Sequence, residues 1–164
     1  MDAKKSLSHF DDAGRPRMVD VSHKDPTARA AIATGLVRMS AEALEIVRTR
    51  SARKGDAAFV AELAGVMAAK RTADLIPLCH PLPLTEAKVE TAIDEAASGV
   101  RVTARVKTTA PTGVEMEALT AVAVACLALY DMLKSVDCTM IIEGVTLLEK
   151  TGGASGDYCR EAET

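Results

Sequence analysis

The sequence predicts an α+β fold in which helices cover one face of an antiparallel sheet. Residues 85–94 and 100–107 alternate apolar and polar side chains on either side of the turn at 97–99, which is typical of two half-buried antiparallel strands. Residues 114–134 are apolar nearly all round, which is typical of a helix covered on more than one side. A chain of 164 residues is long enough to bury roughly two thirds of its unfolded surface in a single core.

The first half of the chain contributes two expected strands. Residues 1–16 are polar and contain turn formers, so they predict an arm rather than a packed element. Residues 17–22 alternate enough for a short strand. Residues 31–39 combine β-branched side chains with a central glycine, which favours a longer strand over a helix.

Two helices follow, each with its own capping residue. Ser40 is expected to cap a helix that runs to about Thr49, and Asp56 a helix that runs to about Thr72. The large apolar side chains of the second helix are expected to be buried on one face. They are Phe59, Val60, Leu63, Val66 and Met67.

The end of the chain completes the pattern. Residues 136–149 contain a final strand with Gly144 as its bulge. The core order is then β-α-α-β-β-α-β, which is a ferredoxin-like antiparallel sheet with helices on one face. We therefore expect an arm with a short strand at 1–22, one domain at 23–150 and a glycine-rich tail at 151–164.

Composition excludes several classes of function. The net charge of −3, with both signs well mixed, gives no global field for nucleic acid or an anionic membrane, and four aromatic residues offer few stacking platforms for single strands. The four cysteines lack C-x-x-C spacing, which indicates free thiols in a reducing compartment. Neither a signal peptide nor an isolated membrane span is evident, so a cytoplasmic location is expected. The cysteines are Cys79, Cys126, Cys138 and Cys159.

A proline-rich loop carries the first candidate site residue. Pro77 ends the helical pattern, and with Pro81 and Pro83 it restricts the loop that presents His80. An imidazole can donate or accept a proton near neutral pH, and the cationic pair at 70–71 lies close in sequence. A packed, hydrogen-bonded histidine remains the competing interpretation.

A cationic loop at residues 48–56 is the second candidate. Lys54 precedes the expected helix cap at Asp56, where anions are favoured. A solvated basic surface is the competing interpretation. The glycine-rich residues 152–157 lack the spacing of a Walker A loop and give a weak phosphate signal.

The charges of the apolar helix lie at its two ends. Glu115 and Glu117 suit the N-terminal end of the helix dipole, whereas Asp131 at the C-terminal end needs a partner, which Lys134 can supply. Such a pair could also transfer protons. At about 1.5 Å per residue, Glu115 and Asp131 lie about 24 Å apart, too far to touch one small substrate. If both ends matter, the site lies between subunits, and a second subunit also covers the helix.

Eight motifs of the chain, taken together, are similar to those of the cyclic pyranopterin monophosphate synthase family (molybdenum cofactor biosynthesis protein C). They are SHFD at 8–11, GRPRMVDVS at 14–22, KGD at 54–56, AKRT at 69–72, LIPLCHP at 75–81, TGVEMEALT at 112–120, YDM at 130–132 with Lys134, and GGASGD at 152–157. The resemblance covers nearly the whole chain.

The resemblance implies an enzyme that converts 3′,8-cyclo-7,8-dihydro-GTP to cyclic pyranopterin monophosphate with release of pyrophosphate. It implies a hexamer built as a trimer of dimers, with sites between subunits. By similarity, Asp131 is the catalytic acid or base, with Lys134 and Lys54 as further proton-transfer or charge-stabilising groups.

Nine further residues are expected to bind the substrate by the same resemblance. Three cations are plausible triphosphate contacts, since pyrophosphate release develops negative charge. The nine are Leu78, Cys79, His80, Glu115, Met116, Glu117 and the cations Arg29, Lys70 and Arg71. Many relatives carry lysine where this chain has Ala154, which weakens the case for a phosphate contact from the tail.

No tightly bound cofactor or dedicated metal site is expected, although Mg²⁺ could accompany the triphosphate. The alternative function is a non-catalytic ferredoxin-like oligomer that senses a nucleotide or metabolite, because this fold hosts many functions. The sequence leaves open which group moves which proton and whether ring opening precedes cyclic phosphate formation.

Overall fold

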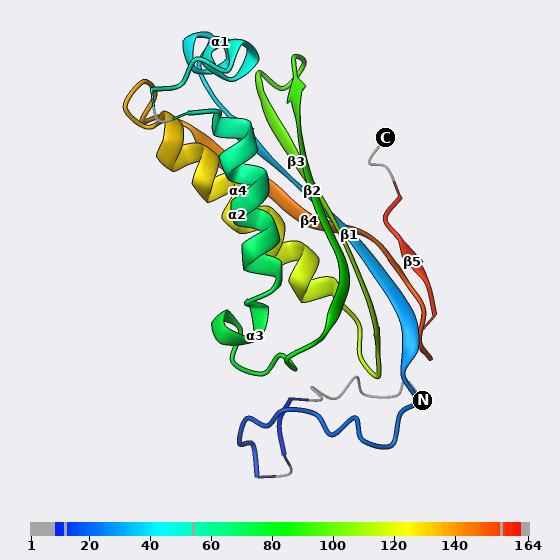
Figure 1. The fold of residues 1–164 in the computed structure, drawn as a ribbon. Coiled ribbons are helices and arrows are strands. Elements are labelled where there is room, and N and C mark those ends of the chain that lie inside the picture. Colours follow the sequence, from blue (N-terminus) through cyan, green and yellow to red (C-terminus); the bar gives the residue numbers. More distant parts are fainter. Residues whose placement is uncertain (1–8, 12, 54, 155, 162–164) are drawn as a thin grey trace.

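A computed structural model describes residues 9–11, 13–53, 55–154 and 156–161. Its sheet has the strand order β2-β3-β1-β4-β5, and every neighbouring pair is antiparallel. The helices lie on one face of this sheet (Figure 1). The bounds are β1 Thr27–Arg38, α1 Ala41–Thr49, α2 Ala57–Ala69, α3 Thr72–Leu75, β2 Leu84–Asp94, β3 Gly99–Ala110, α4 Glu115–Leu133, β4 Ile141–Thr151 and β5 Tyr158–Cys159. This architecture confirms the ferredoxin-like α+β fold.

Local sequence signals place the helix starts. The Ser40 hydroxyl accepts a hydrogen bond from the backbone N–H of Ala43, and the Asp56 carboxylate accepts one from that of Phe59. Both caps satisfy backbone donors that a helix start leaves unpaired, as expected. Gly144 adopts a φ of +63° beside a register shift between β1 and β4, which confirms the expected bulge.

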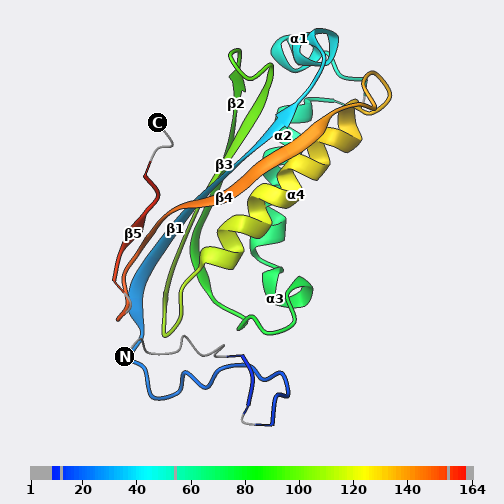
Figure 2. The ribbon, with the colours of Figure 1, turned by 180° about the vertical axis from the view of Figure 1, so that it is seen from behind.

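Two expectations for the sheet were wrong. Residues 17–22 form no strand, because this segment crosses the end of the sheet and has no neighbouring strand to pair with (Figure 2). The strand expected at 31–39 begins earlier, at Thr27, because its first residues also pair with the end of β3. In addition, the tail contains a short strand that was not expected, β5, which pairs with β4 at Glu149 and Lys150.

The expected buried face of α2 was also wrong. Phe59, Leu63 and Met67 are 62%, 51% and 52% exposed, and Val60 and Val66 are half-buried. The helix turns its small residues inward instead, because they allow close packing on α4. These residues are Ala57, Ala61, Gly65, Ala68 and Ala69.

The helices α2 and α4 lie side by side on one face of the sheet, where α4 packs against β1, β3 and β4, and α2 packs against α4 and β2. The second side of α4 was expected to face another subunit, but α2 of the same chain provides that cover. By length and composition α4 could cross a membrane, yet more than half of its apolar window is buried in this core. Its environment is that of the core helix of a globular domain.

Candidate active site

The proline-rich loop between α3 and β2 forms one wall of the candidate site. Its turn is closed by the N–H of Cys79, which donates to the carbonyl of Ile76 at 3.1 Å. The far end is fixed by the Thr108 hydroxyl, which donates to the carbonyl of Pro83 at 2.7 Å. Cys79, which closes the turn, and His80, which follows it, are both half-buried. The loop is therefore held at both ends while its centre faces a cavity.

The first turn of α4 forms the opposite wall. Glu117 is only 4% exposed, whereas Glu115 is half-buried and pairs with Lys150 of β4 at 3.1 Å. Met116, between them, is exposed. The turn thus presents one buried carboxyl group, one paired carboxylate and one apolar side chain to the same region.

These two walls and the N-terminal segment enclose a space of about 370 Å³, which we call the arm cavity. Six of the predicted substrate-binding residues line it, so the structure brings together two motifs that are far apart in the sequence. Its lining is His9, Val19, Val21, Lys24, Leu78, Cys79, His80, Leu82, Thr112, Gly113, Glu115, Met116 and Glu117.

A second space of about 340 Å³, the helix-end cavity, adjoins the first. It is lined by Lys70 and Arg71 at the end of α2, and it shares His80, Leu82 and Glu117 with the arm cavity. Two of the predicted triphosphate contacts therefore lie beside the same histidine and carboxyl group.

The third predicted triphosphate contact, Arg29, lines a further space of about 790 Å³ that we call the glycine-loop cavity. Its Nε donates to the carbonyl of Ala110 at 3.0 Å and its Nη2 to that of Pro111 at 3.1 Å. Gly153 adopts a φ of +83°, which favours glycine, and a Cβ atom there would also displace the guanidinium group. Arg29 thus braces the segment before α4 and keeps further N–H groups for a ligand.

Burial shifts the pKa values of two groups that line the arm cavity, the Glu117 carboxyl and the Cys79 thiol. It raises the pKa of the Glu117 carboxyl above its ordinary value, and the nearby charge of Glu115 adds to the effect. Burial also raises the pKa of the Cys79 thiol, with a smaller contribution from Glu117. The cavity therefore favours a neutral thiol and a carboxyl group that is protonated more readily than usual.

The other end of α4 carries the second group of predicted residues. Lys134 Nζ lies 2.7 Å from Asp131 Oδ1, and this hydrogen-bonded pairing raises the pKa of the Lys134 ammonium group. The expected ion pair is confirmed, and both side chains are more than half exposed. Neither residue lines the three cavities described above.

The segment after α4 is tied to α1 through Asp137. The Asp137 carboxylate accepts hydrogen bonds from the Ser40 N–H at 2.7 Å, the Thr139 N–H at 2.8 Å and the Thr139 hydroxyl at 2.7 Å. These bonds, led by the one from the hydroxyl, hold the pKa of Asp137 below its ordinary value. The C-terminal end of α4 is therefore anchored to the start of α1.

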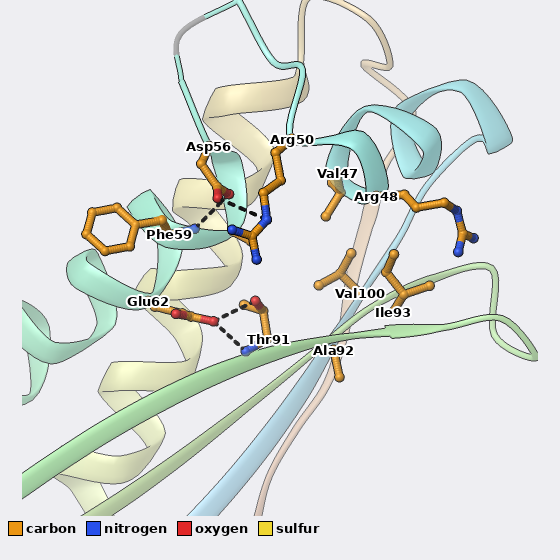
Figure 3. Close-up of a pocket in the computed structure, with 11 residues that line it drawn as sticks. Val47, Arg48, Arg50, Asp56, Phe59, Glu62, Thr91, Ala92, Ile93 and Val100 are labelled. Carbon is orange, nitrogen blue, oxygen red and sulfur yellow. Dashed lines mark hydrogen bonds and ion pairs between the residues drawn. The ribbon is translucent and has the colours of Figure 1, made fainter.

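A fourth space, of about 300 Å³, lies between the α1–α2 connection and β2 (Figure 3). Two pairs of its polar groups bond to each other. Arg50 lies 3.5 Å from the Asp56 carboxylate, and Glu62 accepts hydrogen bonds from the N–H and hydroxyl of Thr91 at 2.9 and 2.7 Å. The arrangement anchors the connection that contains Lys54, a predicted catalytic residue that lies outside the described residues.

The α1–α2 connection and the C-terminal end of α4 lie at one end of the molecule, whereas α3, the first turn of α4 and the N-terminal segment lie toward the other (Figure 1). The residues that line the three cavities come from this second end. The two groups of predicted residues are thus separated within one chain, as the spacing along α4 indicated. Within the described ranges, no group of three His, Cys, Asp or Glu side chains is arranged to hold a metal ion.

Several residues that line or brace the site were not singled out from the sequence. Lys24 lines both the arm cavity and the glycine-loop cavity, and Lys150 holds Glu115 in place. Neither lies in a recognisable chemical pattern. Only the chain path across the end of the sheet brings Lys24 to the site, and only the β1–β4 pairing brings Lys150 there.

Comparison with known proteins gives a consistent result. A family model described as the MoaC family matches residues 18–153. A cyclic pyranopterin monophosphate synthase of Cereibacter sphaeroides (strain KD131 / KCTC 12085) is 60% identical over 152 residues, which cover 93% of this chain and 96% of the relative. Synthases of the same name from Methylobacterium sp. (strain 4-46) and Methylobacterium nodulans are 56% and 57% identical, covering 95% and 96% of this chain and 98% of each relative.

Proposed function

The chain belongs to the MoaC family, and on that basis we propose that it is a cyclic pyranopterin monophosphate synthase of molybdenum cofactor biosynthesis. The reaction converts 3′,8-cyclo-7,8-dihydro-GTP to cyclic pyranopterin monophosphate and releases pyrophosphate. The observation that carries the proposal is the meeting of residues 78–80 and 115–117 in one cavity with cations at its border.

The arm cavity suits the ring system of the substrate. Its wall combines Leu78 and Met116 with the polar groups of His80 and Glu117, so it offers both apolar contact and hydrogen bonds to a purine or pterin. Lys70 and Arg71 of the helix-end cavity and Arg29 of the glycine-loop cavity supply positive charge for the phosphates. Pyrophosphate release needs such cations, because negative charge develops on the leaving group.

Asp131 and Lys134 are the proposed proton-transfer groups, with Lys54 as a further cation. Opening a purine ring and closing a pterin ring require several proton transfers, which a hydrogen-bonded carboxylate and ammonium pair can perform. Their exposure leaves them accessible to a substrate bound by another subunit.

The proposed assembly is a homohexamer, a trimer of dimers. Because Glu115 and Asp131 lie about 24 Å apart along α4, a second subunit is needed to complete each site. The exposed side chains of Phe59, Leu63 and Met67 form an apolar stripe on α2, and Leu127 of α4 is 59% exposed as well. Such a surface is typical of a subunit contact.

We propose no resident cofactor. Mg²⁺ would enter with the triphosphate as part of the substrate, since this ion is usually bound through phosphates and few carboxylates. The free cysteines are the ground for proposing a cytoplasmic enzyme, because thiols persist in a reducing compartment.

The direct test is incubation of the purified protein with the nucleotide made by the radical enzyme of the pathway. We expect pyrophosphate release together with a pterin that becomes fluorescent on oxidation. Lys88→Ala is a suitable control for Lys134→Ala, because Lys88 forms a similar exposed ion pair with Glu90 at 2.8 Å on β2. Tight nucleotide binding without either product would contradict the proposal and favour a sensor.

A further inference from the structure

The N-terminal segment forms part of the wall of the arm cavity. It passes across the end of the sheet near α3 and the proline-rich loop (Figure 2). His9, Val19, Val21 and Lys24 of this segment line the cavity together with His80. Although residues 9–11 and 13–26 contain no helix and no strand paired with the domain, they form part of the surface that a ligand would meet.

One hydrogen bond joins this segment to the proline-rich loop. His80 Nε2 lies 2.8 Å from the carbonyl oxygen of Val19, sixty-one positions away in the sequence. A carbonyl oxygen has lone pairs but no hydrogen, so it can only accept. Nε2 must therefore carry the proton of this bond, whether the ring is neutral or cationic.

The consequence concerns the other ring nitrogen. A neutral imidazole has one N–H and one lone pair, and the partner of one nitrogen decides which atom keeps the lone pair. With Nε2 engaged as a donor to Val19, the lone pair of the neutral ring lies on Nδ1. The turn at Cys79, the hydrogen bond to Pro83 and the prolines restrict the backbone that carries the ring.

We propose that the Val19 carbonyl fixes His80 as the Nε2–H tautomer, so that Nδ1 is the atom the ring offers to the substrate. This inference rests on the proposed function for the identity of the substrate. Nδ1 accepts a proton from the substrate to give an imidazolium that keeps its Nε2–H bond to Val19. Nδ1 then returns that proton to the product or to water, and the ring ends as it began. Val19 is a positioning residue in this scheme.

The tautomer can be measured without any activity. The chain contains three histidines, His9, His23 and His80, so ¹⁵N-histidine labelling gives few ring signals, and His80→Gln identifies those of His80. Solid-state spectra of the sedimented full-length protein, at an alkaline pH where imidazole is neutral, should show His80 protonated at Nε2 and unprotonated at Nδ1. A ring protonated at Nδ1 would overturn the inference, even if the protein proves to be a synthase.

Two matched variants test the role of the bond in holding the segment. Glutamine at position 80 keeps an amide N–H donor near the position of Nε2 but has no titratable nitrogen, whereas His80→Leu has no donor. Limited trypsin digestion at the Arg17–Met18 bond should be several-fold faster in His80→Leu than in the wild type, and unchanged in His80→Gln. Product formation should be lost in both variants. Equal protection of all three proteins, or full activity in His80→Gln, would contradict the inference.

Discussion

Replacing Gly65 with alanine adds one methyl group where α2 packs against α4 and β2. The new Cβ atom would lie 2.9 Å from the carbonyl oxygen of Ala121 and 3.0 and 3.1 Å from the two γ-methyl groups of Val89. Helix propensity alone would make Gly65→Ala stabilising by about 1 kcal/mol. Overpacking against a backbone oxygen costs about 1–3 kcal/mol, so we expect a net loss of about 1 kcal/mol.

Thermal unfolding at fixed protein concentration measures the net change in stability that Gly65→Ala causes. For a chain of this size, a loss of about 1 kcal/mol lowers Tm by about 2–4 °C. Ala64→Gly, at the neighbouring and half-buried position, isolates the propensity effect and should also lower stability by about 1 kcal/mol. A Gly65→Ala protein more stable than the wild type would contradict this expectation, because helix propensity would then outweigh the close contact.

Four further outcomes are expected. Asp131→Asn and Lys134→Ala should each lower product formation at least about tenfold, measured by pyrophosphate release, while nucleotide binding measured by calorimetry stays largely intact. The pKa of Asp137 is lower in the folded protein than its ordinary value, so this group stabilises the fold above that ordinary value and the contribution is lost as pH falls through the folded pKa. Urea titrations should therefore show a weaker acid dependence in Asp137→Asn. Burial raises the pKa of the Cys126 thiol to about 11, so iodoacetamide at pH 8 should modify the exposed cysteines and leave Cys126 intact until the protein unfolds. Phe59→Asp should lower the assembled mass in light scattering if the α2 stripe is a subunit contact, whereas an unchanged mass would place the contact elsewhere.

The elements that short-range chemistry specifies could be predicted from the sequence. Ser40 and Asp56 cap helices through bonds within three residues of themselves, and the alternation of β2 and β3 reports directly on their two faces. Such signals do not depend on the rest of the fold. The order of elements, and with it the ferredoxin-like arrangement, could therefore be derived.

Features that depend on a distant partner could not be derived in this way. The helix α2 is apolar all round, so its sequence does not reveal that Gly65 rather than Phe59 faces α4. The alternation at 17–22 lacked a neighbouring strand, and β5 is ordered only because β4 is beside it. Pattern alone did not predict these pairings.

The candidate site also contains some residues that the sequence could predict and others that it could not. The family resemblance predicted that residues 78–80 and 115–117 bind the substrate, and the structure places both segments in the wall of the arm cavity. The contribution of the N-terminal segment could not be expected from its sequence, because Val19 acts through a backbone carbonyl that any residue possesses. Residues that act through their backbone leave no signal in side-chain chemistry.

In the proposed assembly, each active site combines the arm cavity of one subunit with Asp131 and Lys134 of another. Mixing inactive Asp131→Asn protein with inactive His80→Leu protein, after subunit exchange has been verified by mass, tests it directly. We expect mixed assemblies to regain part of the product formation, because some sites then contain neither substitution. If exchange is complete and the mixture stays inactive, the two ends of α4 do not meet in a shared site.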